Sequence, residues 1–93
     1  MHVIAKRALR EFWTRHPEAE GPLTQWHAVL AKSAPGNFAQ LKAIFGSVDR
    51  VAGYVIFDIG GNKYRLVADV VFRSQMVFIK RVMTHAEYDR WKP

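Results

Sequence analysis

The chain contains no cysteine among its 93 residues. A disulfide scaffold, a thiolate zinc site and a cysteine nucleophile are therefore excluded, and we expect a reducing, cytoplasmic location. No apolar run approaches the roughly 18 residues that a membrane span needs. No uninterrupted apolar stretch follows the basic residues near the N-terminus. We therefore expect neither a membrane association nor a secretory signal.

Several motifs that carry chemistry are also missing from the sequence. There is no P-loop, no G-x-G-x-x-G and no G-x-S-x-G. No two His, Asp or Glu residues stand at a convincing metal-ligand spacing, so we expect no metal and no cofactor. Because repeats, linkers and low-complexity tracts are absent as well, residues 1–93 are expected to form a single domain.

Positive charge is what the chain has in excess. The formal net charge is +6, from 14 basic and 8 acidic residues. Residues 1–16 and 54–93 each carry a net charge of +3, whereas residues 17–53 are neutral. On so small a domain this balance favours a polyanionic partner: RNA, DNA or an acidic protein.

The N-terminal half shows helical periodicity. Residues 1–4 are short and apolar and predict an edge or inserted strand. Apolar side chains in residues 5–13 then recur at i, i+3, i+4, i+7 and i+8, which predicts a helix that Pro17 ends. A second helix is expected to begin between Pro17 and Pro22 and to stop by Ser33.

Two short helices are indicated by their capping residues. Asn37 with Gln40, and Thr84 with Glu87, stand three residues apart as in a capping box. They predict helices over residues 38–45 and 85–91.

The segment between these caps has β character. Residues 54–59 are aromatic and β-branched, residues 60–62 offer turn chemistry, and residues 63–72 and 76–83 predict two further strands. Strands joined by hairpins and segregated from helices indicate an α+β fold with a mainly antiparallel sheet. The N-terminal helices are expected to pack on one face, which leaves the other open and partly polar.

Cations lie on the predicted strands. Lys63 and Arg65 are two apart and project from one face about 6–7 Å apart, so they could hold neighbouring phosphates or simply be solvated. Lys80 and Arg81 fall on opposite faces, so one of them is expected to point toward the helices or the core edge, where a charge is usually paired or functional. Arg73, near a turn, is interpreted as solvated.

His85 and Tyr88 are more specific candidates for a functional site, because they share one face of the last helix. The N-terminus of a helix favours an anion near His85. His can exchange a proton near neutral pH, and Tyr can donate one. The alternative is an exposed His and a half-buried Tyr on a structural helix. The residues alone thus leave open whether the domain cleaves RNA without a metal or only binds it.

The order and spacing of several segments are similar to those of the HigB toxin family, whose members are mRNA interferases of type II toxin–antitoxin systems within the RelE-like superfamily. The resemblance covers nearly the whole chain, and its segments are Ala8–Trp13, Asn37–Lys42, Gly61–Leu66 and Thr84–Asp89. It implies a small RelE-like domain with a short C-terminal helix.

The family resemblance implies a reaction as well. RelE-like toxins cut mRNA, typically on the translating ribosome, and the 2′-OH of the RNA attacks the scissile phosphate without a metal. Lys63 and Arg65 would then bind phosphate and stabilise the transition state, with Arg81 as a further ligand. His85 and Tyr88 would move protons, although their spacing leaves open which is base and which is acid, and Lys63 could also serve as base.

Partners follow from the same resemblance. A HigA-type helix-turn-helix antitoxin is expected, together with mRNA and the ribosome, and operator DNA would be bound only through the antitoxin. The expected RNA-binding surface comprises Lys6, Arg7, Arg10, Arg73 and Lys80, of which the first three could instead meet the antitoxin. The alternatives are a non-catalytic RNA- or DNA-binding module and an inactive partner in a repressor complex.

Overall fold

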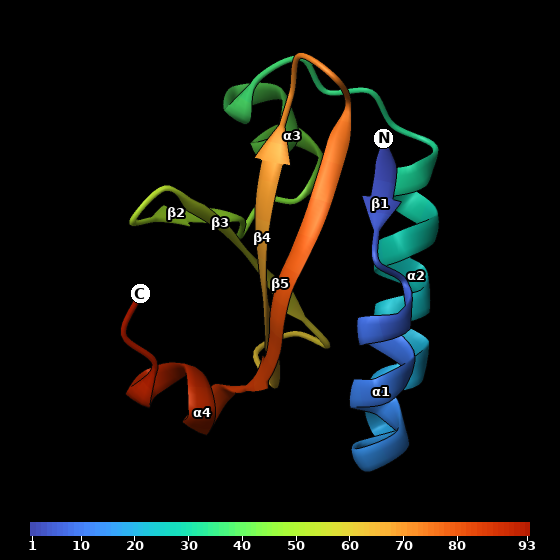
Figure 1. Ribbon diagram of the computed structural model, residues 1–93, viewed down its shortest axis with the longest axis vertical. Helices are drawn as coiled ribbons and strands as arrows, with labels where there is room; N and C mark the ends of the chain where they lie inside the picture. Colours follow the sequence, from blue (N-terminus) through green and yellow to red (C-terminus); the bar gives the residue numbers. More distant parts are fainter.

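The computed structural model describes residues 1–93 and has the expected α+β architecture (Figure 1). Its elements, in chain order, are β1 (His2–Ile4), α1 (Arg7–Arg15), the 3₁₀ turn η1 (Pro17–Ala19), α2 (Glu20–Ala31), α3 (Phe38–Ile44), β2 (Asp49–Val51), β3 (Tyr54–Ile59), β4 (Tyr64–Val71), β5 (Met76–Thr84) and α4 (His85–Arg90). No helix among them combines the length and apolar character that crossing a membrane requires.

The five strands form one sheet in the order β1-β5-β4-β3-β2. Strands β2 to β5 are antiparallel neighbours, whereas β1 pairs in parallel with β5. Figure 1 shows α1 and α2 side by side on one side of the sheet and α4 on the other. The prediction of a mainly antiparallel sheet with the N-terminal helices on one face is confirmed.

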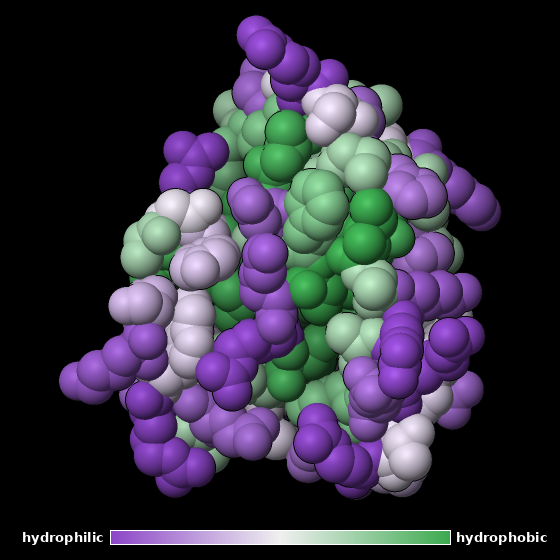
Figure 2. Space-filling view, viewed as in Figure 1, coloured by the Kyte–Doolittle hydropathy of each residue, from purple (hydrophilic) through white to green (hydrophobic).

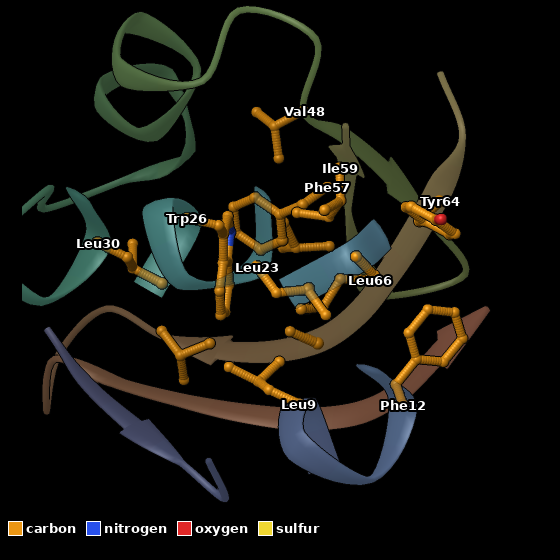
Figure 3. Close-up of a cluster of buried hydrophobic side chains, with 14 of the residues drawn as sticks. Leu9, Phe12, Leu23, Trp26, Leu30, Val48, Phe57, Ile59, Tyr64 and Leu66 are labelled. Carbon is orange, nitrogen blue, oxygen red and sulfur yellow. The ribbon is translucent and has the colours of Figure 1, made fainter. Parts of the chain in front are cut away.

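The main core lies between the sheet and helices α1 and α2. It is a cluster of 15 buried residues, and Figure 3 shows part of it. The ring of Trp26 meets that of Phe57 edge-on, with 5.2 Å between centroids. Leu9, Leu23 and Leu66 are fully buried, and each such side chain stabilises the fold by about 1.5–3 kcal/mol. The apolar helix faces that the sequence periodicity predicts therefore form the main core.

A much smaller cluster occupies the opposite, open face. It consists of Ile56, Val67 and Met83 from the three central strands. Tyr88 and Trp91 at the C-terminal end pack against it. These two aromatic side chains anchor α4 to the sheet.

A β-bulge decides which side chains of β5 reach the open face. Val67 pairs with Arg81, but Ala68 pairs with Ile79, so Lys80 is an extra residue without a partner. One inserted residue reverses the alternation of side chains beyond it. Both Lys80 and Arg81 are exposed, and the prediction that one of them points toward the helices or the core edge is wrong for this reason.

The structure also adds a strand that the sequence did not predict. Strand β2 has only three residues and forms a hairpin with β3 through Ala52 and Gly53. Both turn residues have positive φ, 51° and 85°, as a two-residue type I′ turn requires. The strand is too short to show alternation in the sequence.

Candidate active site

Arg65 is the buried charge of the protein and lies on the open face. The residue is only 9% exposed. Its Nε lies 3.0 Å from Oδ1 of Asp58, the residue directly opposite on β3. Its terminal nitrogens donate to the side-chain oxygen of Asn62 and to the backbone oxygen of Tyr64. The interpretation of Arg65 as part of a solvated strand face is therefore wrong.

The guanidinium of Arg65 also contacts α4. Its Cζ lies 5.7 Å from the centroid of the Tyr88 ring. A cation over the face of an aromatic ring is attracted by the ring quadrupole, by roughly 0.5–1 kcal/mol where water has access and more where it does not. Asp58 is thus paired with Arg65, and Arg65 in turn contacts Tyr88.

Lys63 lies just before β4, in the turn that follows β3, and its side chain is exposed. Its backbone oxygen accepts a hydrogen bond from the backbone N–H of His85 at 2.9 Å. This bond joins the β3–β4 turn to the first residue of α4. The sequence motif around Lys63 and the one around His85 are thus adjacent in space.

A complete capping box starts α4, as the sequence predicted. The Thr84 hydroxyl accepts from the backbone N–H of Glu87, and the Glu87 carboxylate accepts from the backbone N–H of Thr84. This second bond is the main reason why the pKa of Glu87 lies below its usual value, and the positive charges of His16 and Arg15 contribute. Glu87 therefore stays ionised and keeps the first turn of α4 closed.

His85 occupies the first position of α4. Its Nε2 lies 3.4 Å from Oδ2 of Asp89, one turn along the helix. Its Nδ1 is buried and has no hydrogen-bond partner. His85 thus has one ring nitrogen facing a carboxylate and one uncommitted nitrogen.

A hollow of about 430 Å³ opens on the same face beside these residues. Arg81 and Met83 reach it from β5, and the remaining lining residues come from α4 and the segment after it: Glu87, Arg90, Trp91 and Lys92. In Figure 2, hydrophilic side chains gather at the lower left, where α4 and the C-terminus lie in Figure 1.

The structure therefore brings part of the predicted site together. Arg65 contacts Tyr88 directly, the backbones of Lys63 and His85 are joined, and Arg81 shares the open face. The five residues expected to bind RNA are all exposed but lie elsewhere. Lys6, Arg7 and Arg10 are at the start of α1, Arg73 is in the β4–β5 turn, and Lys80 is in the bulge.

Sequence reasoning missed the residues that hold and surround this site. Asp58 and Asn62 clamp Arg65, and Arg90, Trp91 and Lys92 line the hollow. Opposite charges facing each other on neighbouring strands are a recognised pair, so the hairpin register could have indicated Asp58. No group of three or more His, Asp or Glu side chains is arranged as a metal ion would need.

Comparisons with known proteins point in one direction. A family model described as "HigB_toxin, RelE-like toxic component of a toxin-antitoxin system" matches residues 19–91. The "mRNA interferase toxin HigB" of Escherichia coli strain K12 is 37% identical over 92 residues, which span 96% of this chain and 88% of that protein. The "mRNA interferase HigB" of E. coli O6:H1 strain CFT073 is 26% identical over 93 residues, 97% of this chain and 90% of that protein.

Proposed function

The chain belongs to the HigB family of RelE-like toxins, and from this premise we propose that it is a metal-independent endoribonuclease that cleaves mRNA on the translating ribosome. As the toxic component of a toxin–antitoxin system, it has an antitoxin as its partner. We propose an antitoxin of the HigA type, which carries the operator-binding domain. Because translating ribosomes are its proposed site of action, we also propose a cytoplasmic location.

The RNA supplies the nucleophile in this mechanism. Its 2′-OH attacks the neighbouring phosphorus, and the bond to the 5′ oxygen of the next nucleotide breaks. The protein must align the attack, stabilise the added negative charge and move two protons. No serine, cysteine or metal is required for these tasks.

Arg81 and Lys63 are the cations available for the phosphate. Both are exposed, and neither side chain makes an ion pair within the protein. A guanidinium can bind two phosphate oxygens at once, whereas an ammonium acts as a point charge. We assign Arg81 to phosphate binding and Lys63 to charge stabilisation or proton transfer.

Tyr88 and His85 are the proton-transfer groups in this proposal, and Arg65 supports them. Arg65 is buried beside Tyr88, but Asp58 at 3.0 Å balances its charge, so its contribution in this proposal is to position the Tyr88 ring. Most of its N–H groups are already bound by Asp58, Asn62 and Tyr64. Arg65 therefore contributes mainly by position, with little donor capacity left for RNA.

The observation that carries the proposal is this buried Arg65–Tyr88 contact on an open, cationic sheet face. Inducible expression in bacteria with 5′-end mapping of cellular mRNA tests it. The wild type should arrest growth and create new mRNA ends within reading frames, and Arg81→Ala should lose both. Lys32→Ala removes an equal charge from the end of α2, on the other side of the sheet, and should remain toxic.

Other outcomes would support a different phosphate site or a different function. Cleavage that survives Arg81→Ala would move the phosphate site to Lys63 or Arg65. A folded wild-type protein that binds RNA in a salt-dependent way but creates no new ends would favour the non-catalytic binding module. Tight antitoxin binding without toxicity would indicate an inactive partner.

A further inference from the structure

The hollow beside Arg81 contains groups that the proposed reaction does not use. Apart from Arg81, the proposed chemistry assigns no role to the residues that line it. Three of its six lining residues are cations, one is a carboxylate and one is an indole, that of Trp91. The Glu87 carboxylate already accepts a hydrogen bond from the backbone of Thr84, at 2.8 Å. Three cations and one committed carboxylate leave the hollow positively charged.

Trp91 packs against two tyrosine rings at this hollow. Tyr88 stacks on it with 5.9 Å between centroids and 28° between ring planes. Tyr54 meets it edge-on, also with 5.9 Å between centroids. Neither tyrosine lines the hollow, so the contacts with Trp91 leave the lining of the hollow to the indole. A flat aromatic ring at a cationic hollow is the arrangement on which single-stranded bases stack.

Three cations line the hollow together with this ring. Arg90 and Lys92 flank Trp91 in the chain, and both are exposed. Arg81 approaches from β5. No ion pair within the protein occupies any of the three. Successive phosphates of a nucleic acid strand could therefore be bound on either side of a stacked base.

We propose that this hollow binds one nucleotide of single-stranded RNA beside the scissile phosphate, with its base stacked on Trp91 and the flanking phosphates held by Arg90 and Lys92. The inference rests on the proposed function in taking RNA as the ligand and in placing the scissile phosphate at Arg81. An acidic peptide would satisfy the cations but would make little use of a supported flat ring. The ring is therefore the feature that favours a nucleotide.

The test uses the full chain and a probe that cannot be cleaved. A fluorescein-labelled, fully 2′-O-methylated hexanucleotide of mixed sequence has no free 2′-OH, so its binding can be measured by anisotropy without reaction. Trp91→Leu should weaken binding about 10-fold, whereas Trp91→Phe should stay within about 3-fold of the wild type. The unlabelled hexanucleotide should quench tryptophan fluorescence in the wild type. The quenching should disappear in Trp91→Phe, although Trp13 and Trp26 remain.

Charge is tested separately from stacking. The double variant Arg90→Gln with Lys92→Gln should reduce the slope of log Kd against log salt by about 1.4, because two phosphate contacts to a single strand are lost. Lys32→Gln is the control, since Lys32 is exposed, makes no ion pair and follows α2 on the other side of the sheet. Its salt slope should equal that of the wild type.

The proposal is overturned if Trp91→Leu binds the probe as tightly as the wild type, or if quenching persists in Trp91→Phe. Competition by a polyglutamate peptide at the same charge concentration as the hexanucleotide would assign the hollow to an acidic protein instead. The outcome is independent of catalysis. Probe binding that depends on Trp91 in a protein that never cleaves mRNA would keep the nucleotide site and refute the nuclease. Cleavage with Trp91-independent binding would do the reverse.

Discussion

The two faces of the sheet differ in what they bury. The face under α1 and α2 buries a cluster of 15 apolar residues, whereas the open face buries three. The buried charge, Arg65, belongs to the open face, together with the Tyr88 and Trp91 rings. One face thus supplies most of the folding free energy and the other most of the chemistry. Substitutions on the two faces should therefore separate stability from activity.

The largest effect is expected from the helix-covered face. Leu66→Ala removes a side chain with 0% exposure and should cost about 2–5 kcal/mol of unfolding free energy. Urea denaturation measures it. Val71→Ala, on the same strand but 37% exposed, should change stability by at most about 0.5 kcal/mol. Equal losses in the two variants would contradict the division between the faces.

The next effect tests the clamp on the open face. Asp58→Ala leaves Arg65 without its carboxylate and should cost about 1.5–3 kcal/mol of stability. It should also lower the rate of mRNA cleavage at saturating substrate, because Tyr88 is no longer held. Asp49→Ala, an exposed carboxylate on β2, is the control for both measurements. If Asp58→Ala loses stability but cleaves at the wild-type rate, Arg65 does not position Tyr88.

A smaller effect is expected at the start of α4. Thr84→Ala removes the hydroxyl that accepts from the backbone N–H of Glu87 and should cost about 1 kcal/mol, measured by thermal unfolding. Thr84→Ser keeps the hydroxyl and should restore the wild-type value. Because the cap holds α4, we also expect the alanine variant to lose cleavage, and full activity in that variant would argue against a role for the cap.

The smallest effect is expected in how folding stability depends on pH, which differs between the two faces. Burial, with the positive charge of Lys6, lowers the pKa of His27 in α2. The folded protein therefore favours neutral His27. The stability this gives is complete above the ordinary pKa of 6.5 and is lost as the pH falls toward and through the lowered value.

Glu87 also contributes stability that is lost as the pH falls, but in a lower pH range. Its pKa is lowered chiefly by the backbone hydrogen bond from Thr84, so its stabilising effect is complete above 4.5 and is lost as the pH falls through the lowered value. Stability measured against pH should thus decline in two separate ranges. His27→Gln should flatten only the range nearer neutrality. A variant that flattens both or neither would show that the assignment is wrong.

The helix-covered face was the easier one to predict from sequence. Leu9, Phe12, Leu23 and Leu30 follow helical spacing and are buried, and β3 has the predicted bounds Tyr54–Ile59. Periodicity reports burial directly, so it identified these elements. The resemblance to HigB toxins, carried by the segments around Lys63 and His85, is likewise confirmed by the family match.

The open face was harder to predict because it depends on pairing between strands. The bulge at Lys80 breaks the two-residue alternation of side chains along β5. Counting along the strand therefore predicted wrongly that either Lys80 or Arg81 points toward the helices or the core edge. The burial of Arg65 depends on Asp58 lying opposite it, which the register of the β3–β4 hairpin decides. Catalytic roles for Lys63, Arg65, Arg81, His85 and Tyr88 stay predictions.

The parallel pairing of β1 with β5 has a consequence for how the toxin is made. His2 pairs with Met76 and Ile4 with Phe78, so the first strand of the chain can bond only to the last. During folding, contacts between segments so distant in the sequence form late, after the local hairpins. During synthesis, α1 and α2 leave the ribosome well before β5, which carries Arg81 and leads into α4. The sheet therefore cannot be completed, nor Arg81 brought to the open face beside α4, until β5 has been synthesised and has paired with β4.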